Sequence, residues 1–164
     1  MIQTIEQVID AFADAANRHT VIESFDAGGT EYFFNNLNNV EFPHCFFRYV
    51  DWNRELTRVT INFELVAVDR VTTDNNYDTD RADGLPAAFN WNKNNVTQID
   101  STRDLIDGLV SLVKFGDHRG SITIGDGYSA TFIGRGLDST VGWTVPLTIS
   151  FESALDLTDV PTNS

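Results

Sequence analysis

The sequence predicts an α+β fold: a single domain, 1–164, in which a mainly antiparallel sheet packs against two amphipathic helices, with one long excursion loop. Two stretches, 57–68 and 143–152, alternate apolar and polar residues with the period of two that is typical of a half-buried strand. Two others, 4–19 and 95–116, repeat apolar residues at helical spacing. Such helices need an apolar surface to cover, and a sheet of such strands provides one.

The first helix is expected to begin at a capping box, in which Thr4 is followed three residues later by Gln7. Its end is expected at 17–19, and its apolar stripe is Ile5, Val8, Ile9, Phe12 and Ala16. The segments "TVIESF" and "TEYFF" then flank "DAGG", whose glycines predict a short hairpin. After a polar loop, Pro43 favours an extended entry into "HCFFRYV", which its aromatic and β-branched content marks as a strand.

The two alternating strands each have one apolar face, and these faces supply most of the predicted core. The two helices supply the rest of it. The predicted core residues are Phe12, Val59, Ile61, Phe63, Leu65, Ile106, Leu109, Trp143, Val145, Leu147 and Ile149. The last strand contains Pro146, which donates no backbone hydrogen bond, so this strand is expected at a sheet edge or paired through a bulge.

The second helix is expected from Asn95 to about Gly116, with a break in its apolar stripe at Arg103. The segment "SITIGDGYSATFIGR" follows, and it predicts a strand, a Gly-Asp-Gly turn and a second strand. The end of the chain, 157–164, is polar and is expected to fray.

The excursion loop, 69–94, has no periodic pattern, and loops of this length are usually functional. It carries four large apolar residues that no core face accounts for: Tyr77, Leu85, Phe89 and Trp91. Two interpretations stay open, because these side chains can anchor a protein interface or fold back as a lid on the core. An edge strand also offers its backbone to a partner, which adds Thr144, Pro146 and Thr148 to the candidate interface.

The charge of the chain excludes some partners. Eleven basic and 24 acidic residues give a net charge of -13, which repels phosphate and anionic lipid, so we expect no sequence-specific nucleic-acid binding. An acidic channel would still let DNA slide through. No signal peptide and no apolar stretch of the roughly 20 residues that span a bilayer is visible, so we expect a soluble protein without a membrane partner.

Catalytic and metal-binding patterns are lacking, so we expect a protein that is not an enzyme and has no cofactor. His44 and Cys45 are adjacent, but neighbours on a strand point to opposite faces, which works against a catalytic dyad. The single cysteine excludes an internal disulfide, and no zinc-ligand spacing occurs. The acidic loop partly matches a calcium-binding loop, and its candidate oxygen ligands are Asp74, Asn76, Asp78, Asp80 and Asp83. However, Phe89 occupies the position of the bidentate glutamate in that pattern.

The order of short signatures resembles a known family. The signatures are "VIESFDAGG", the acidic-aromatic-Pro entry "NNVEFPHCFFRYV", the strand "FELVAVDRV" ending in Asp, the helix "NNVTQIDSTRDLIDGLVSLV" and the closing "DSTVGWTVPLTISFE". Together they are similar to the tail-terminator, or tail-completion, proteins of tailed bacteriophages, which are small α/β domains. The loop at 69–94 is longer than in the usual pattern.

The resemblance implies a structural role in the virion. It implies a homohexameric ring at the head-proximal end of the tail, which terminates the tail tube and joins it to the neck. The expected partners are other copies of the chain, the tail tube protein and the neck or connector proteins, with DNA able to pass through the ring. The expected location is the tail–neck region of the virion, after a soluble stage in the host cytoplasm. The alternatives are a related neck or head–tail adaptor component, and a monomeric ligand-binding module that uses the loop aromatics.

Overall fold

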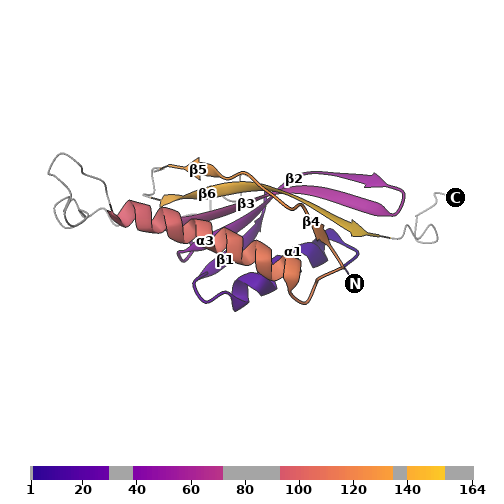
Figure 1. Cartoon of the computed structure of the whole chain (residues 1–164), viewed down its shortest axis with the longest axis horizontal. Coiled ribbons are helices and arrows are strands. Elements are labelled where there is room, and N and C mark those ends of the chain that lie inside the picture. Colours follow the sequence, from indigo (N-terminus) through magenta and orange to yellow (C-terminus); the bar gives the residue numbers. More distant parts are fainter. Residues whose placement is uncertain (1, 30–38, 72–92, 135–139, 154–164) are drawn as a thin grey trace.

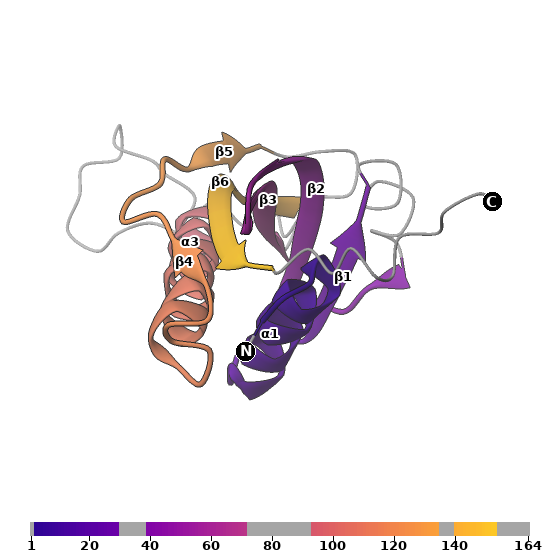
Figure 2. The ribbon, with the colours of Figure 1, turned by 90° about the vertical axis from the view of Figure 1, so that its right-hand side faces the viewer.

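The computed structural model describes residues 2–29, 39–71, 93–134 and 140–153. Within them, six strands form one mostly antiparallel sheet and two helices cover one of its faces, so the predicted α+β class is confirmed (Figures 1 and 2). The strand order is β1-β2-β3-β6-β4, and β5 also pairs with β6. The elements are α1 (Ile5–Arg18), β1 (Ser24–Gly28), β2 (His44–Glu55), β3 (Arg58–Arg70), α3 (Lys93–Phe115), β4 (Thr123–Ile124), β5 (Thr131–Ile133) and β6 (Thr140–Glu152).

Helix α1 begins and ends where the sequence predicts. The Thr4 hydroxyl accepts a hydrogen bond from the Gln7 backbone N–H at 3.2 Å, and the Gln7 side chain accepts one from the Gln3 backbone N–H at 2.7 Å. His19 is the C-cap residue. The helix buries Val8, Ala11, Phe12, Ala15 and Ala16, whereas Ile5 in the first turn stays partly exposed. Thr4 therefore caps the helix as expected, and the Gln7 side chain binds the backbone N–H of Gln3, one residue before the N-cap residue.

The core lies between the two helices and the sheet. All predicted core residues except Trp143 are buried; these are Phe12, Val59, Ile61, Phe63, Leu65, Ile106, Leu109, Val145, Leu147 and Ile149. Trp143 is half-buried and packs against the same cluster, and its indole N–H donates to the Ile99 carbonyl at 2.9 Å. The Phe47 ring stacks on Phe12 and Phe63, with ring centroids 4.4 and 4.1 Å apart. These rings join α1 to the centre of the sheet.

The hairpin predicted around "DAGG" is wrong. Residues Ser24–Gly28 form β1, which pairs in parallel with β2 in the register Ser24 with His44. A parallel pair needs a crossover connection rather than a tight turn. The physical reason is burial. Phe25 and Ala27 lie on the same face of β1 and pack against the core, and their burial outweighs the preference of the glycines for a turn.

The hairpin predicted around Gly-Asp-Gly is also wrong, because β4 and β5 pair with β6 and not with each other. Strand β4 lies against Ile149 and Ser150 of β6, and β5 lies against 142–144. The other side of β6 pairs with β3 along its whole length. Strand β6 is therefore an interior strand, and the predicted edge position is corrected.

Pro146 lies in the interval between β4 and β5. Two residues further on, Thr148 accepts a hydrogen bond from the Gly125 N–H at 3.4 Å, so its backbone faces away from β3. Residues two apart on a strand turn their backbone groups to the same side, so the Pro146 nitrogen faces outward as well. The proline is tolerated because no described strand pairs with β6 at this point.

Helix α3 extends two residues further towards the N-terminus than predicted, from Lys93, and it ends before Gly116 as expected. The predicted excursion at 69–94 thus begins in β3 and ends in α3. Its middle part, with Tyr77, Leu85, Phe89 and Trp91, lies outside the described residues, as do the calcium-loop candidates and the tail at 157–164.

Candidate functional site

One end of the sheet projects beyond both helices (Figure 1). Strand β1 pairs only with His44–Arg48 of β2, so from Tyr49 to Glu55 the outer edge of β2 faces no strand within the described ranges. We call residues 49–58, which include the turn into β3, the distal hairpin. Its tip is held by the end of β6, since the Ser153 N–H donates to the Thr57 carbonyl at 2.7 Å and Arg54 donates to the Ser153 carbonyl at 3.2 Å.

The distal hairpin exposes large apolar side chains. Tyr49 is 45% exposed, Val50 53%, Trp52 61% and Leu56 93%. With Ile5, they make five of the ten exposed large apolar side chains in the described part of the chain. A shallow hollow of about 280 Å³ is lined by Ile5, Tyr49, Val50, Asp51, Trp52 and Ile61. Exposed apolar groups gathered in this way are typical of an interaction surface.

A β-bulge decides which face the aromatic rings occupy. The register between β2 and β3 shifts between Tyr49 and Asp51, which leaves Val50 as an extra residue. Tyr49 therefore pairs with Phe63, and Trp52 pairs with Ile61, and both partners belong to the core face. In a regular strand, residues three apart would point to opposite faces. The bulge thus extends the apolar face beyond the first turn of α1.

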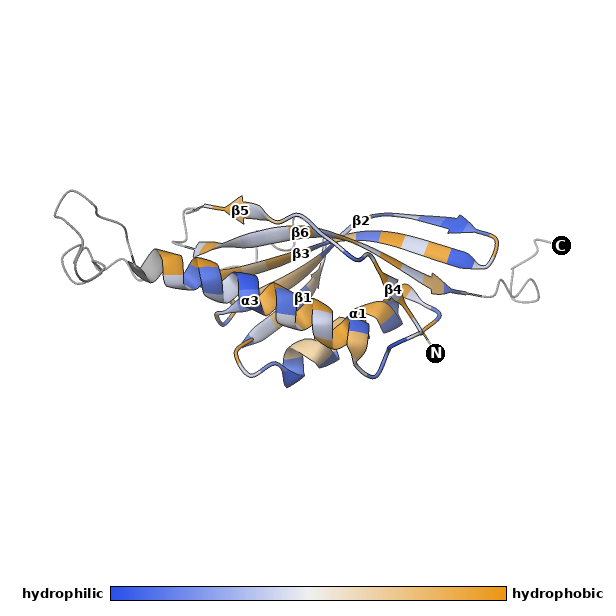
Figure 3. Ribbon diagram, in the orientation of Figure 1, coloured by the Kyte–Doolittle hydropathy of each residue, from blue (hydrophilic) through white to orange (hydrophobic). Residues whose placement is uncertain are grey.

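The turn of the distal hairpin is strained. Leu56 has φ of 51°, a conformation that glycine and asparagine adopt readily and leucine does not. Its side chain is almost fully exposed, so packing within the described part of the chain does not offset the strain. Figure 3 shows the hydrophobic colour of this turn and the alternation along the β3 arm. A strained, exposed apolar residue points to a function other than folding.

Leu56→Asn is expected to raise the free energy of unfolding by about 1 kcal/mol, because asparagine tolerates positive φ. Urea denaturation measures this. The matched control is Leu56→Ala, which removes the apolar side chain but keeps the strain, and which should bring no gain in stability. An equal gain in both variants would show that exposure of the side chain, and not the backbone conformation, is what costs stability.

The sequence candidates His44 and Cys45 point to opposite faces, as expected. Cys45 is fully buried in the main core, and burial raises the pKa of its thiol to about 12, so it is not a thiolate at neutral pH. His44 is buried on the other face, where Phe46, Val66 and Val68 form a small second cluster. The pair therefore makes no catalytic dyad.

His44 is bonded to β1. The Ser24 hydroxyl lies 2.5 Å from the Glu41 carbonyl, which can only accept, and 2.7 Å from Nδ1 of His44. Ser24 thus donates to Glu41, and Nδ1 of His44 carries a proton that it donates to Ser24. Nε2 lies 4.0 Å from the Asp26 carboxylate. Because the Ser24 hydroxyl donates its proton to the Glu41 carbonyl and not to His44, His44 does not activate Ser24 as a nucleophile.

The stability of the protein should fall as the pH drops below about 6.5. Burial lowers the pKa of His44, and this outweighs the attraction of Asp26 and a hydrogen bond to the Ser24 backbone, which both raise the pKa. Below its ordinary value of 6.5, the unfolded chain binds a proton at this residue that the folded chain does not, so folding stability is lost until the lowered folded pKa is reached. Urea denaturation between pH 7.5 and 5.5 measures the loss.

His44→Asn is the control for this prediction, since its amide N–H can still donate to Ser24 but does not titrate. The loss between pH 7.5 and 5.5 should be smaller in the variant. Titration of the His44 ring followed by NMR gives a second measurement on the unmodified chain. A His44 pKa above 6.5 would contradict the prediction.

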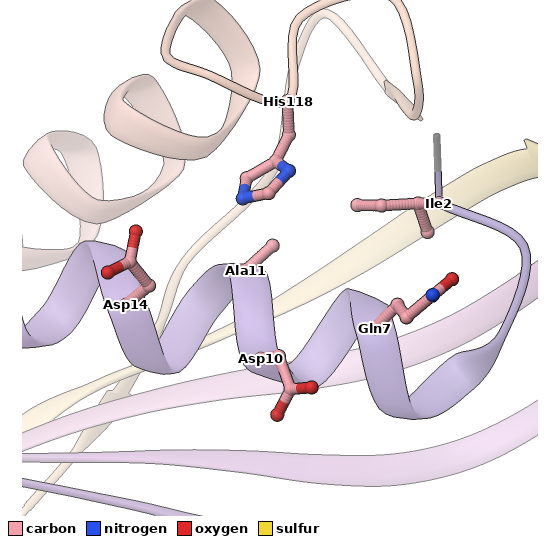
Figure 4. Close-up of a pocket in the computed structure, with 6 residues that line it drawn as sticks. All are labelled: Ile2, Gln7, Asp10, Ala11, Asp14 and His118. Carbon is pink, nitrogen blue, oxygen red and sulfur yellow. The ribbon is translucent and has the colours of Figure 1, made fainter.

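A second hollow, of about 390 Å³, lies between α1 and the segment that follows α3. In Figure 4 the imidazole of His118 lies over Ala11, and the Asp14 carboxylate is turned to the same side, whereas Asp10 is turned away. Asp14 is already bound to Arg18 at 2.9 Å. No group of three or more potential metal ligands occurs among the described residues. This hollow lacks the convergent groups that a catalytic site needs.

The predicted interface residues of β6 lie on the face opposite to the helices. Pro146 and Thr148 are exposed, and Thr148 donates to the Asn62 side chain at 2.8 Å. Thr144 is half-buried between its register partners Val66 and Thr131. The structure thus separates these residues from the exposed rings of the distal hairpin, which turn to the helix-covered face.

Sequence reasoning missed the distal hairpin as a candidate surface. The available signal was an aromatic residue, Trp52, within the polar run "DWNRE" that follows a predicted strand. Its significance depends on the bulge and on the short length of β1, and neither can be read from a period of two.

No protein-family model matches the chain, and no curated protein sequence matches it either. Neither α1 nor α3 is long and apolar enough to cross a membrane.

Proposed function

We propose that the chain is a structural component of a bacteriophage virion that forms a ring at the head-proximal end of the tail. The ring terminates the tail tube and joins it to the neck, and it contains six copies, as the resemblance to tail terminators implies. The proposal rests on that resemblance and on one observation above all. The distal hairpin presents exposed apolar residues beside an open length of β2.

An open strand with exposed rings favours assembly over catalysis. Unpaired N–H and C=O groups along a strand are a template for another strand, and proteins that work alone usually cover or charge such an edge. Three charged residues lie in this stretch, Asp51, Arg54 and Glu55, and the Asp51 carboxylate accepts a hydrogen bond from the Asn62 side chain. Arg54 is engaged with the end of β6. This edge is thus suited to a partner chain.

An open edge on one side of each copy is compatible with a ring. An open edge that meets a different patch on the next copy gives a head-to-tail contact, which closes into a ring when its rotation divides the circle. The acidity of the chain supports a conduit, because a net charge of -13 keeps the DNA backbone from sticking to the ring.

The test uses particles of the phage that encodes the chain. Particles assembled without the chain are expected to have tails of uneven length that are not joined to heads, and supplying the chain from a plasmid should restore them. Electron microscopy of the complemented particles should place the chain as a ring between tail tube and neck. Normal tails in its absence, or density for the chain elsewhere, would exclude the proposal and favour an adaptor or a binding module.

A further inference from the structure

We infer that the ring contact is a strand-to-strand junction, in which β5 of one copy pairs with the open part of β2, Tyr49–Glu55, of the next. The inference rests on the proposed function for the existence of the ring, and it adds the two surfaces that meet. They lie on opposite sides of the β6–β3–β2 strands (Figure 2). The partner is a second copy of this chain.

The β5 edge is a further open edge of the sheet, as are the outer sides of β1 and β4 within the described residues. Strand β5 pairs with β6 on one side, and no described strand pairs with its other side. Phe132 in β5 is 47% exposed, although its ring packs edge-on against Trp143 at 5.6 Å between centroids. Like the distal hairpin, β5 thus combines an exposed aromatic side chain with unpaired backbone N–H and C=O groups, which can pair with another strand.

The segments that form the two edges carry no net charge, although the whole chain is strongly acidic. The distal hairpin has two acidic residues, Asp51 and Glu55, and two basic ones, Arg54 and Arg58, which cancel. Residues 127–134, around β5, contain no charged residue. In a chain of net charge -13, two copies repel less where these two segments meet than where two acidic segments meet.

The strand directions allow the sheet to continue. Strands β5 and β6, β6 and β3, and β3 and β2 are antiparallel pairs. Strand β5 therefore runs opposite to β2, so a β5 strand added to β2 of the next copy makes one more antiparallel pair. Strand β1 already occupies 44–48 of β2, and the incoming strand takes the part that β1 leaves open.

The side chains fall on matching faces. Phe132 pairs with Trp143, whose ring packs against the core beneath the helices. Tyr49 and Trp52 lie on that same face through the bulge. Across the junction, Phe132 of one copy would thus lie beside the Tyr49 and Trp52 rings of its neighbour, and cross-strand aromatic pairs stabilise sheets.

Disulfide capture tests the junction, because buried Cys45 leaves introduced cysteines as the reactive ones. The double variants Trp52→Cys/Phe132→Cys and Tyr49→Cys/Phe132→Cys cover two registers. After oxidation of concentrated protein, at least one of them should give a ladder of covalent oligomers on a non-reducing gel. The matched control is Phe115→Cys/Phe132→Cys, since Phe115 is 65% exposed but lies at the end of α3. It should give no ladder.

Two charge variants test whether the junction is head-to-tail. Trp52→Glu blocks one edge and Phe132→Glu the other, so each alone should weaken self-association by at least about tenfold. A mixture of the two variants still contains one native junction, and it should form one-to-one dimers and nothing larger. Both are surface changes, and unaltered thermal unfolding shows that each variant folds.

The outcomes separate this inference from the proposed function. Absence of a ladder in both double variants overturns the junction, as does a Trp52→Cys variant that forms dimers without Phe132→Cys. If no ladder forms but the chain still forms a ring on particles, the proposed function stands without this junction. If the ladder forms but particles lack the chain at the neck, the junction stands and the proposed function is wrong.

Discussion

Gly142→Ala is expected to destabilise the protein by more than about 3 kcal/mol. A Cβ atom at this position would lie 1.8 Å from the Ala67 carbonyl oxygen and 2.9 Å from the Val68 Cα. Both are backbone atoms of β3 in the middle of the sheet, so neither can move without breaking the pairing of β3 with β6. The glycine is therefore required by the close approach of two strands. Denaturant unfolding of the purified variant measures the effect.

Gly127→Ala is the matched control, because nothing lies within 4 Å of the added Cβ. Its free energy of unfolding should stay within about 0.5 kcal/mol of that of the unmodified chain. If both alanine variants unfold at the same denaturant concentration as the unmodified chain, the approach of β3 and β6 is looser than described.

Phe63→Ala is expected to cost about 3 to 5 kcal/mol, the range for an aromatic side chain removed from a core. The Phe63 ring is buried, stacks on Phe47 and faces Tyr49, with ring centroids 5.8 Å apart. Its removal leaves a cavity at the join between α1, the centre of the sheet and the base of the distal hairpin. Thermal and urea unfolding both report the loss.

The control for the core prediction lies on the other face of the neighbouring strand. Thr148 is exposed and its hydroxyl donates only to Asn62, so Thr148→Ala should cost less than about 1 kcal/mol. Equal costs for the two variants would mean that the faces of the sheet are wrongly assigned.

The candidate surface was only partly accessible to sequence reasoning. Exposed aromatic residues and an open strand were expected, but at 69–94 and in the last strand. The loop residues Tyr77, Leu85, Phe89 and Trp91 lie outside the described structure, so their role stays a prediction. The last strand proved interior, because two short strands share its outer side and leave only the interval at Pro146. Pairing over such short lengths leaves almost no signal in a sequence.

The α+β class, the ends of α1 and the inward faces of β3 and β6 can be predicted from the amino-acid sequence. These features are local: a capping box acts within four residues, and burial of one face imposes a period of two or 3.6 along a single element. Which strands are neighbours depends on how the whole chain packs. Strand β1 pairs in parallel with β2, β4 and β5 both pair with the same side of β6, and β2 has a bulge at Val50. These features depend on contacts between separate elements, where the burial of whole faces outweighs local turn preferences. Those pairings leave the edges of β2 and β5 open, and the proposed assembly depends on them.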